Sequence, residues 1–225
     1  MNNDIKNRAE KIPGPILVIG ASGFIGANIF RTLYKFRKDV YGTSSHSEPW
    51  RLKEIDADNI IVSDLLVQSS LDTLLNEVSP KTIINCAAYG GYSFQTDIAL
   101  IYQTNFHLVV NLLEALAPMG IHAFLQAGTS SEYGRNASGP DETTPATPNS
   151  HYAVSKSAAT QLLYYMAKEH AIPCINLRIY SAYGPFEDSS RLIPQVVIQG
   201  KKGKLPDFVR PEISRDFIYV EDVVK

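Results

Sequence analysis

The chain is 225 residues long, 44% of them hydrophobic and 20% charged, and its formal net charge is -2 at pH 7. This composition predicts an ordinary globular protein with a substantial apolar core and excludes a disordered chain. The nearly balanced charge provides no basic field, so the sequence excludes nucleic acid as the partner.

Residues 1–14 are predicted to form a loose N-terminal tail. They carry charges of both signs without the apolar stretch of a signal peptide, and no later run of about eighteen apolar residues would span a membrane. The two cysteines, Cys86 and Cys174, lie in separate strand-like runs, which indicates neither a disulfide framework nor a thiolate metal site. We therefore expect a soluble, cytoplasmic protein without a membrane partner.

Strands and helices are predicted to alternate from residue 16 onward. The apolar run Ile16 to Ile19 is followed by glycines and then by 24–36, whose apolar residues recur at helical spacing. Further strands are predicted at 39–44, 59–65, 81–88, 122–128 and 174–180, and further helices at 71–78, 97–117 and 150–170. This alternation favours an α/β fold, a doubly wound parallel sheet with helices on both faces.

The glycine-rich stretch GASGFIG, residues 20–26, follows the first predicted strand and opens the first predicted helix. In that context Gly20 would permit a tight turn, Gly23 would let the backbone approach a pyrophosphate, and Gly26 would allow close helix packing. The phosphates would lie at the helix N-terminus, whose free N–H groups favour anions. A glycine turn needed for packing alone is the alternative.

Tyr152 and Lys156 stand four residues apart in the predicted helix 150–170. That spacing places both side chains on one helix face, where a cation lowers the pKa of a phenol and suits it to general acid/base catalysis. An isolated pair at this spacing is also common on ordinary amphipathic helices. The segment 136–150, polar with three prolines, is predicted to be a loop that leads the chain to Tyr152.

Several motifs in a common order resemble one family over nearly the whole chain from Ile16 onward. They are GASGFIG, Pro148 before the Tyr152 and Lys156 pair, TSSEYG at 129–134, LRIYSAYGP at 177–185 and RDFIYVEDV at 215–223. Together they resemble the extended short-chain dehydrogenase/reductase family of NAD(P)-dependent epimerases and dehydratases, which implies a Rossmann fold. SAYGPFEDSSRLIP is similar to nucleotide-sugar epimerases and 4-ketoreductases, including enzymes that make CDP-linked dideoxysugars.

The resemblance implies a catalytic set of Thr129, Tyr152, Lys156 and Asn105. Thr129 would hydrogen-bond the substrate oxygen and Tyr152 would exchange its proton. Lys156 would hold the nicotinamide ribose and lower the pKa of Tyr152. Asn105 resembles the helix asparagine that supports a proton relay, and a surface or helix-packing amide is an equal alternative.

The resemblance also assigns residues to a dinucleotide cofactor. They are Gly20, Ser22, Gly23, Phe24, Ile25, Gly26, Ser44, Ser45, Asp64, Leu65, Ala87, Ala88 and Lys156. Members that use NAD place a carboxylate after the second strand for the ribose 2′-hydroxyl, where this chain has Ser44, then Ser45 and His46 with Arg51 nearby. Hydroxyls and a cation favour a 2′-phosphate. We expect NADP in preference to NAD, with a merely polar loop as the alternative.

The residues implied for the nucleotide sugar are Tyr89, Ser130, Ser181, Arg191 and Arg215. Arg215 matches an arginine that pairs with the diphosphate, and Arg191 and Arg210 are weaker candidates. Ser181 replaces an asparagine of many members, which puts that contact in doubt. Members that dehydrate their substrate carry an Asp-Glu pair after the threonine, where this chain has Ser130 and Ser131, so dehydration is not expected.

These inferences predict a Rossmann domain at 15–180 and a small substrate-binding region at 181–225. That region is expected to be incomplete, because family members continue for roughly another hundred residues. The predicted function is 4-keto reduction of a nucleotide-linked sugar. A nucleotide-sugar epimerase with tightly bound NAD and a non-catalytic dinucleotide-binding protein are the alternatives. A homodimer is expected through the helices 97–117 and 151–170.

Overall fold

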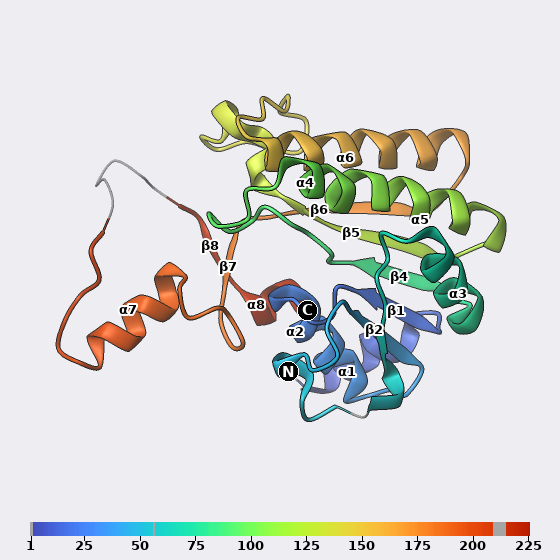
Figure 1. Cartoon of the computed structure of the whole chain (residues 1–225), viewed down its shortest axis with the longest axis horizontal. Helices are drawn as coiled ribbons and strands as arrows, with labels where there is room; N and C mark the ends of the chain where they lie inside the picture. Colours follow the sequence, from blue (N-terminus) through green and yellow to red (C-terminus); the bar gives the residue numbers. More distant parts are fainter. Residues whose placement is uncertain (1, 56, 209–214) are drawn as a thin grey trace.

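The computed structural model describes residues 2–55, 57–208 and 215–225, and a six-stranded parallel sheet forms its centre (Figure 1). The strands are β1 (Ile16–Ile19), β2 (Val40–Ser44), β3 (Ile60–Val62), β4 (Thr82–Asn85), β5 (Ala123–Thr129) and β6 (Cys174–Ile179). They lie in the order β3-β2-β1-β4-β5-β6, and every neighbouring pair is parallel. This is the strand order of the Rossmann fold, and it confirms the predicted doubly wound sheet.

Helices cover the sheet on two faces. On one face α3 (Gln68–Val78), α5 (Leu108–Leu116) and α6 (His151–Glu169) bury an apolar cluster that includes Leu17 and Ile19 of β1. On the other face α2 (Phe24–Tyr34) forms a cluster with Ile16 and Val18. Successive residues of β1 therefore enter opposite cores, which explains why its sequence is an unbroken apolar run.

The N-terminal segment is a helix, and the prediction of a loose tail is wrong. Helix α1 (Asn2–Lys11) packs on the α2 side of the sheet, where Ala9 is buried and Ile12 contacts the core. Arg37 donates hydrogen bonds to the carbonyls of Ala9 and Ile12, near the C-terminus of α1, and forms an ion pair with Asp39. The sequence did not predict this helix because it has few apolar residues. The Arg37 contacts that hold the helix depend on the fold and leave no signal in the local sequence.

The predicted helix 97–117 is present, with a change of geometry in its middle. It consists of α4 (Ile98–Tyr102), a π-helical turn (Gln103–His107) and α5. Asp97 begins it, because its carboxylate accepts a hydrogen bond from the Leu100 N–H. Single π-helical turns occur often at functional sites, and this one carries Asn105.

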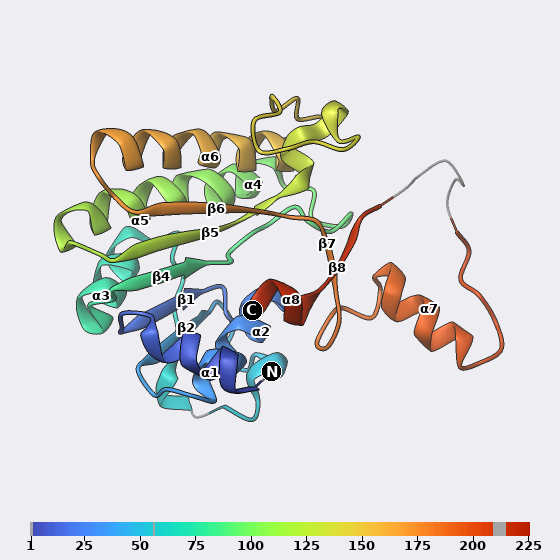
Figure 2. The same ribbon diagram turned by 180° about the vertical axis from the view of Figure 1, so that it is seen from behind.

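The described part of the stretch predicted to bind substrate contains four elements. Strands β7 (Ser181–Tyr183) and β8 (Phe217–Tyr219) pair in parallel, and α8 (Val220–Val224) packs against α2. Helix α7 (Leu192–Gly200) lies away from the sheet in both views (Figures 1 and 2). The division into two domains stays a prediction. Within the described ranges, none of the helices is both long enough and apolar enough to cross a bilayer.

Candidate active site and cofactor crevice

The turn between β1 and α2 has the geometry that its glycines predict. Gly20 adopts φ +71°, and a Cβ there would lie 2.7 Å from the backbone nitrogen of Ala87. A Cβ at Gly26 would lie 2.3 Å from the Gly20 oxygen, so a larger residue would push α2 away from the turn. Thr43, at the end of β2, accepts a hydrogen bond from the Gly20 N–H at 3.0 Å.

A crevice of about 330 Å³ opens beside this turn, at the carboxyl ends of β1 and β4. The strand order reverses between these two strands, which is where doubly wound sheets bind their ligands. Nine residues predicted from the sequence line the crevice: Gly20, Ser22, Gly23, Ser45, Asp64, Leu65, Ala87, Ala88 and Tyr89. The sequence reasoning missed Thr43, Cys86, Leu100 and Thr104, although Thr43 and Cys86 carry a usable signal because each lies at the carboxyl end of a strand.

The crevice fits the phosphates of a dinucleotide. The N–H groups in the first turn of α2, which include those of Phe24 and Ile25, have no partner within the helix, and such groups bind anions. Because Gly20 and Gly26 have no Cβ, the phosphates could approach the backbone of this turn closely. A Cβ at either position would fill that space.

The polar loop after β2 is organised differently from the prediction. Ser44 is buried, and its hydroxyl donates to the His46 carbonyl at 2.7 Å and accepts from the His46 N–H at 3.0 Å. Arg51 donates to the carbonyl oxygens of Phe186 and Ser22, at 2.8 and 3.2 Å. The Ser44 hydroxyl and the Arg51 guanidinium therefore bind backbone groups, whereas Ser45 lines the crevice.

Thr129 and Tyr152 meet where β5 ends and α6 begins. The Thr129 hydroxyl accepts a hydrogen bond from the Ser131 N–H at 3.1 Å, and it lies close enough to the Tyr152 phenol to act on the pKa of that phenol. Ser150 begins α6, because its hydroxyl accepts a hydrogen bond from the Ala153 N–H. The strand end and the helix start thus bring together two hydroxyl groups that the resemblance predicts to act on one substrate oxygen.

The pKa of Tyr152 is raised, and the predicted lowering by Lys156 is wrong for this structure. Burial of the phenol has the largest effect and outweighs the hydrogen bond from Thr129, which acts in the opposite direction. The Lys156 ammonium instead donates to the Ala127 carbonyl at 2.7 Å. The side chains share a helix face as predicted, but a backbone acceptor holds the lysine.

Lys156 is almost completely buried, with 2% of its surface exposed. Burial lowers its pKa to about 8, against opposing effects of Glu132 and Cys86. Burial also raises the pKa of Cys86 to about 12, with Lys156 acting against it. Cys86 lines the crevice, whereas Lys156 is not among the residues that line it.

Asn105 is completely buried and ties a crevice loop to α6. Its oxygen accepts from the Tyr89 N–H at 2.9 Å, and its nitrogen donates to the Tyr89 carbonyl and the Ser155 hydroxyl, at 2.7 and 3.0 Å. A Cβ on the adjacent Gly90 would lie 3.5 Å from the Tyr152 ring. Asn105 thus holds the loop beside Tyr152, and its relay function stays a prediction.

The predicted substrate residues lie in two groups. Arg191 donates to the Gly91 carbonyl at 3.3 Å and lies over the ring of Tyr92, near Tyr89. Ser181 is the first residue of β7, and Arg215 lies just before β8 and is exposed. Ser130 is partly buried in the turn after Thr129. Arg210 lies outside the described residues.

Comparisons with known proteins agree with this arrangement. The sequence profile described as the NAD dependent epimerase/dehydratase family matches residues 16–225. The chain is 30% identical over 223 residues to the uncharacterized UDP-glucose epimerase YtcB of Bacillus subtilis, covering 93% of this chain and 70% of that protein. It is also 30% identical over 226 residues to a dTDP-glucose 4,6-dehydratase of Xanthomonas campestris, covering 92% of this chain and 64% of that protein.

A solved structure shares the fold over most of this chain. The UDP-glucose 4-epimerase of Thermus thermophilus, in complex with NAD, superposes with a TM-score of 0.80 at 27% identity, covering 93% of this chain and 71% of that chain. The similarity therefore includes the whole sheet and the crevice at its carboxyl edge.

Proposed function

The chain belongs to the NAD dependent epimerase/dehydratase family, whose profile matches residues 16–225, and on that premise we propose that it is a nucleotide-sugar epimerase that uses NAD. Enzymes of this family act on nucleotide sugars, and family structures are solved with NAD bound. One observation carries the proposal for this chain: Thr129 and Tyr152 lie together beside the loop of Tyr89 and Gly90, and Tyr89 lines the glycine-rich crevice.

Each residue of the site has a separate role in the proposed reaction. NAD, when bound, supplies the acceptor and donor of a hydride. Thr129 hydrogen-bonds the sugar oxygen at the reacting carbon, and Tyr152 accepts and returns the proton on that oxygen. Lys156 would hold the ribose next to the nicotinamide. Gly20, Gly23 and Gly26 let the backbone contact the pyrophosphate.

Epimerisation is favoured over dehydration. Dehydration needs an additional acid and base to remove water, whereas the two positions after Thr129 carry Ser130 and Ser131. Epimerisation needs room for the sugar to turn, and a Cβ on Gly91 would meet nothing within 4 Å. The loop is therefore uncrowded at Gly91, next to the Gly90 that faces the Tyr152 ring.

A 4-keto reductase that uses NADPH is the second candidate. It is favoured by Ser44, which stands where NAD-dependent relatives are expected to have a carboxylate. Ser44 hydrogen-bonds His46, and Arg51 donates to two backbone carbonyls, so neither group needs a 2′-phosphate as its partner. This weakens the argument for NADPH. We therefore rank NAD above NADP.

The first test is to denature the purified protein and to identify any released dinucleotide by mass spectrometry. Tightly held NAD supports the epimerase, because each hydride removed is returned and the cofactor need not leave. An empty site that binds NADPH more tightly than NADH supports the reductase instead. Turnover is then measured with UDP-glucose and dTDP-glucose for the epimerase and with nucleotide-linked 4-keto sugars for the reductase.

Tyr152→Phe tests the mechanism. We expect turnover to fall by roughly 10²- to 10⁴-fold, the usual contribution of a general acid/base, while the dissociation constant for NADH stays at its wild-type value. Tyr164→Phe, an exposed tyrosine on the same helix, is the matched control. Wild-type rates in Tyr152→Phe would refute the mechanism. Dinucleotide binding without turnover of any nucleotide sugar would support a non-catalytic protein.

We also propose a homodimer through α4, α5 and α6, which lie side by side (Figures 1 and 2). Exposed apolar side chains on this layer, Ile98, Val154, Tyr164 and Tyr165, support it. Light scattering should give twice the chain mass of 24.9 kDa. A single-chain mass at high concentration would contradict the dimer.

A further inference from the structure

Glu132 is a completely buried carboxylate directly after Ser130 and Ser131. It belongs to the 3₁₀ turn Ser130–Asn136 that follows β5. Burying an ionised carboxylate is costly unless it is paired and hydrogen-bonded. Its partners therefore indicate what the charge does.

One oxygen of Glu132 holds the turn that carries Thr129. Oε1 accepts the Thr129 N–H at 3.1 Å, while the Thr129 hydroxyl accepts the Ser131 N–H at 3.1 Å. These reciprocal bonds form a capping box, which fixes the first turn of a helix relative to its cap. Because the cap is Thr129 itself, the carboxylate also fixes the hydroxyl that meets Tyr152.

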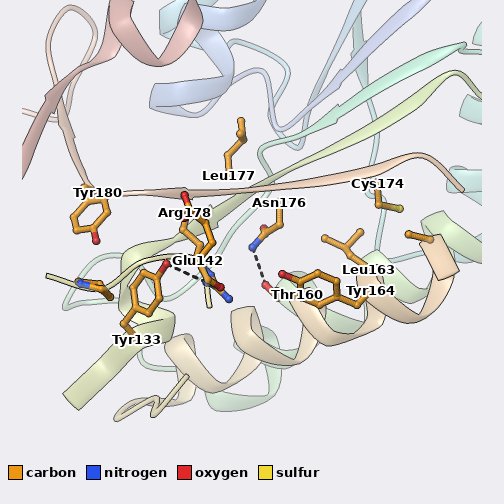
Figure 3. A pocket seen from close by; sticks show the side chains of 12 residues that line it. Tyr133, Glu142, Thr160, Leu163, Tyr164, Cys174, Asn176, Leu177, Arg178 and Tyr180 are labelled. Carbon is orange, nitrogen blue, oxygen red and sulfur yellow. Dashed lines mark hydrogen bonds between the residues drawn. The ribbon is translucent and has the colours of Figure 1, made fainter. Parts of the chain in front are cut away.

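The other oxygen joins the turn to α6 and β6. Oε2 accepts the Thr160 hydroxyl at 2.8 Å and Nε of Arg178 at 3.3 Å. The contacts continue outward, as Figure 3 shows: Asn176 donates to Thr160 at 2.9 Å, and Arg178 donates to the Tyr133 phenol at 3.0 Å. Thr160 lies one helical turn after Lys156 on α6, so the carboxylate connects the Thr129 turn to the helix of the predicted catalytic pair.

The charge of Glu132 reaches both members of that pair. It raises the pKa of Lys156, where Cys86 acts in the same direction and burial opposes both. It also raises the pKa of Tyr152, whose other neighbours, Thr129 and Arg191, act in the opposite direction. From β6, the Arg178 guanidinium faces the carboxylate itself.

We propose that Glu132 is a positioning residue for the proposed reaction. Its carboxylate holds the Thr129 turn against α6 and supplies the buried negative charge that keeps Lys156 protonated. Both oxygens are engaged between the turn, α6 and β6, so Glu132 acts through Thr129 and Lys156 without contacting substrate. This inference rests on the proposed roles of Thr129, Tyr152 and Lys156.

The test that needs no substrate is the titration of Lys156. In protein labelled with ¹³C at the lysine ε-carbon, the Lys156 signal is the one that disappears in Lys156→Met. We expect its midpoint in Glu132→Gln to move to lower pH by about one unit, since a neighbouring opposite charge commonly shifts a pKa by that much or more. Thr160→Val, which removes a hydrogen bond to Glu132 but no charge, is the control and should keep the wild-type midpoint.

An unchanged midpoint in Glu132→Gln, or an equal shift in Thr160→Val, would overturn the electrostatic part. If Glu132→Gln does not fold by circular dichroism, Glu132→Asp takes its place. Aspartate keeps the charge, so the midpoint should stay near the wild-type value. Its shorter side chain cannot hold Thr129 and Thr160 together, so kcat should fall, and a wild-type kcat would overturn the positioning part.

Turnover of UDP-glucose provides a separate readout. In Glu132→Gln we expect kcat to fall at least tenfold with little change in KM, and the alkaline limb of the kcat profile to move to lower pH. Thr160→Val should keep the wild-type limb. A kcat profile identical to wild type in Glu132→Gln would refute the proposal. If the wild-type protein turns over no nucleotide sugar, the proposed function fails, and the lysine titration still decides whether Glu132 controls Lys156.

Discussion

Replacing Lys156 with methionine should stabilise the protein at neutral pH while abolishing turnover. Burial lowers the pKa of Lys156 from 10.5 to about 8, and each pKa unit corresponds to about 1.4 kcal/mol, so burying the charged lysine opposes folding by about 3 kcal/mol. Methionine fills a similar volume without a charge. Losing the hydrogen bond to the Ala127 carbonyl removes about 1 kcal/mol, which leaves a net gain of about 2 kcal/mol in the free energy of unfolding.

The sign of the pH dependence follows from proton binding. Between the folded pKa of about 8 and the unfolded value of 10.5, the unfolded chain binds one proton more than the folded chain, so wild-type stability rises with pH in this window. The advantage of Lys156→Met should therefore be complete below pH 8 and shrink as pH rises toward 10.5.

Urea unfolding followed by circular dichroism between pH 7 and 10 measures this difference. Lys168→Met, an exposed lysine on the same helix, is the matched control and should track the wild type at every pH. A Lys156→Met protein less stable than wild type at pH 7, or a difference that stays constant with pH, would refute the reasoning.

Two further substitutions test the crevice. Gly26→Ala should weaken NADH binding at least tenfold, because its Cβ would lie 2.3 Å from the Gly20 oxygen. A fluorescence titration measures the dissociation constant. Gly200→Ala, whose Cβ meets nothing within 4 Å, is the control. Equal NADH dissociation constants in the two variants would contradict the role of Gly26 in the phosphate-binding turn. Asn105→Leu should lower the free energy of unfolding by about 3 kcal/mol in urea, because it leaves the Tyr89 N–H and carbonyl without a partner. A change below about 0.5 kcal/mol, the size expected at a neutral surface position, would show that the Tyr89 loop does not depend on this amide.

The sequence predicted the sheet and the crevice well because their signals are local. Strands buried on both faces, such as β1, appear as short apolar runs, and the glycines at 20, 23 and 26 mark the turn after the first strand. The carboxyl ends of parallel strands meet at one edge, so the predicted cofactor residues gather there. Helix α1 was missed because its docking depends on Arg37, which is 28 residues from Ala9.

The partners of the predicted catalytic residues could not be read in the same way. Spacing placed Tyr152 and Lys156 on one helix face, and the structure confirms it. It could not reveal that Lys156 donates to Ala127, 29 residues away, or that burial raises the pKa of Tyr152. The sequence did not single out Glu132, which accepts a hydrogen bond from Arg178, 46 residues away.

The sequence by itself therefore determined the order of the elements, the glycine turn and the side chains available for chemistry. Periodicity, turn residues and i,i+4 spacing are properties of neighbouring residues, and they survive without a folded context. Only the tertiary structure decided the protonation of the site and the partners of its charges. Desolvation and hydrogen bonding at this site depend on which distant segments pack together, and both effects shift the pKa of a buried group.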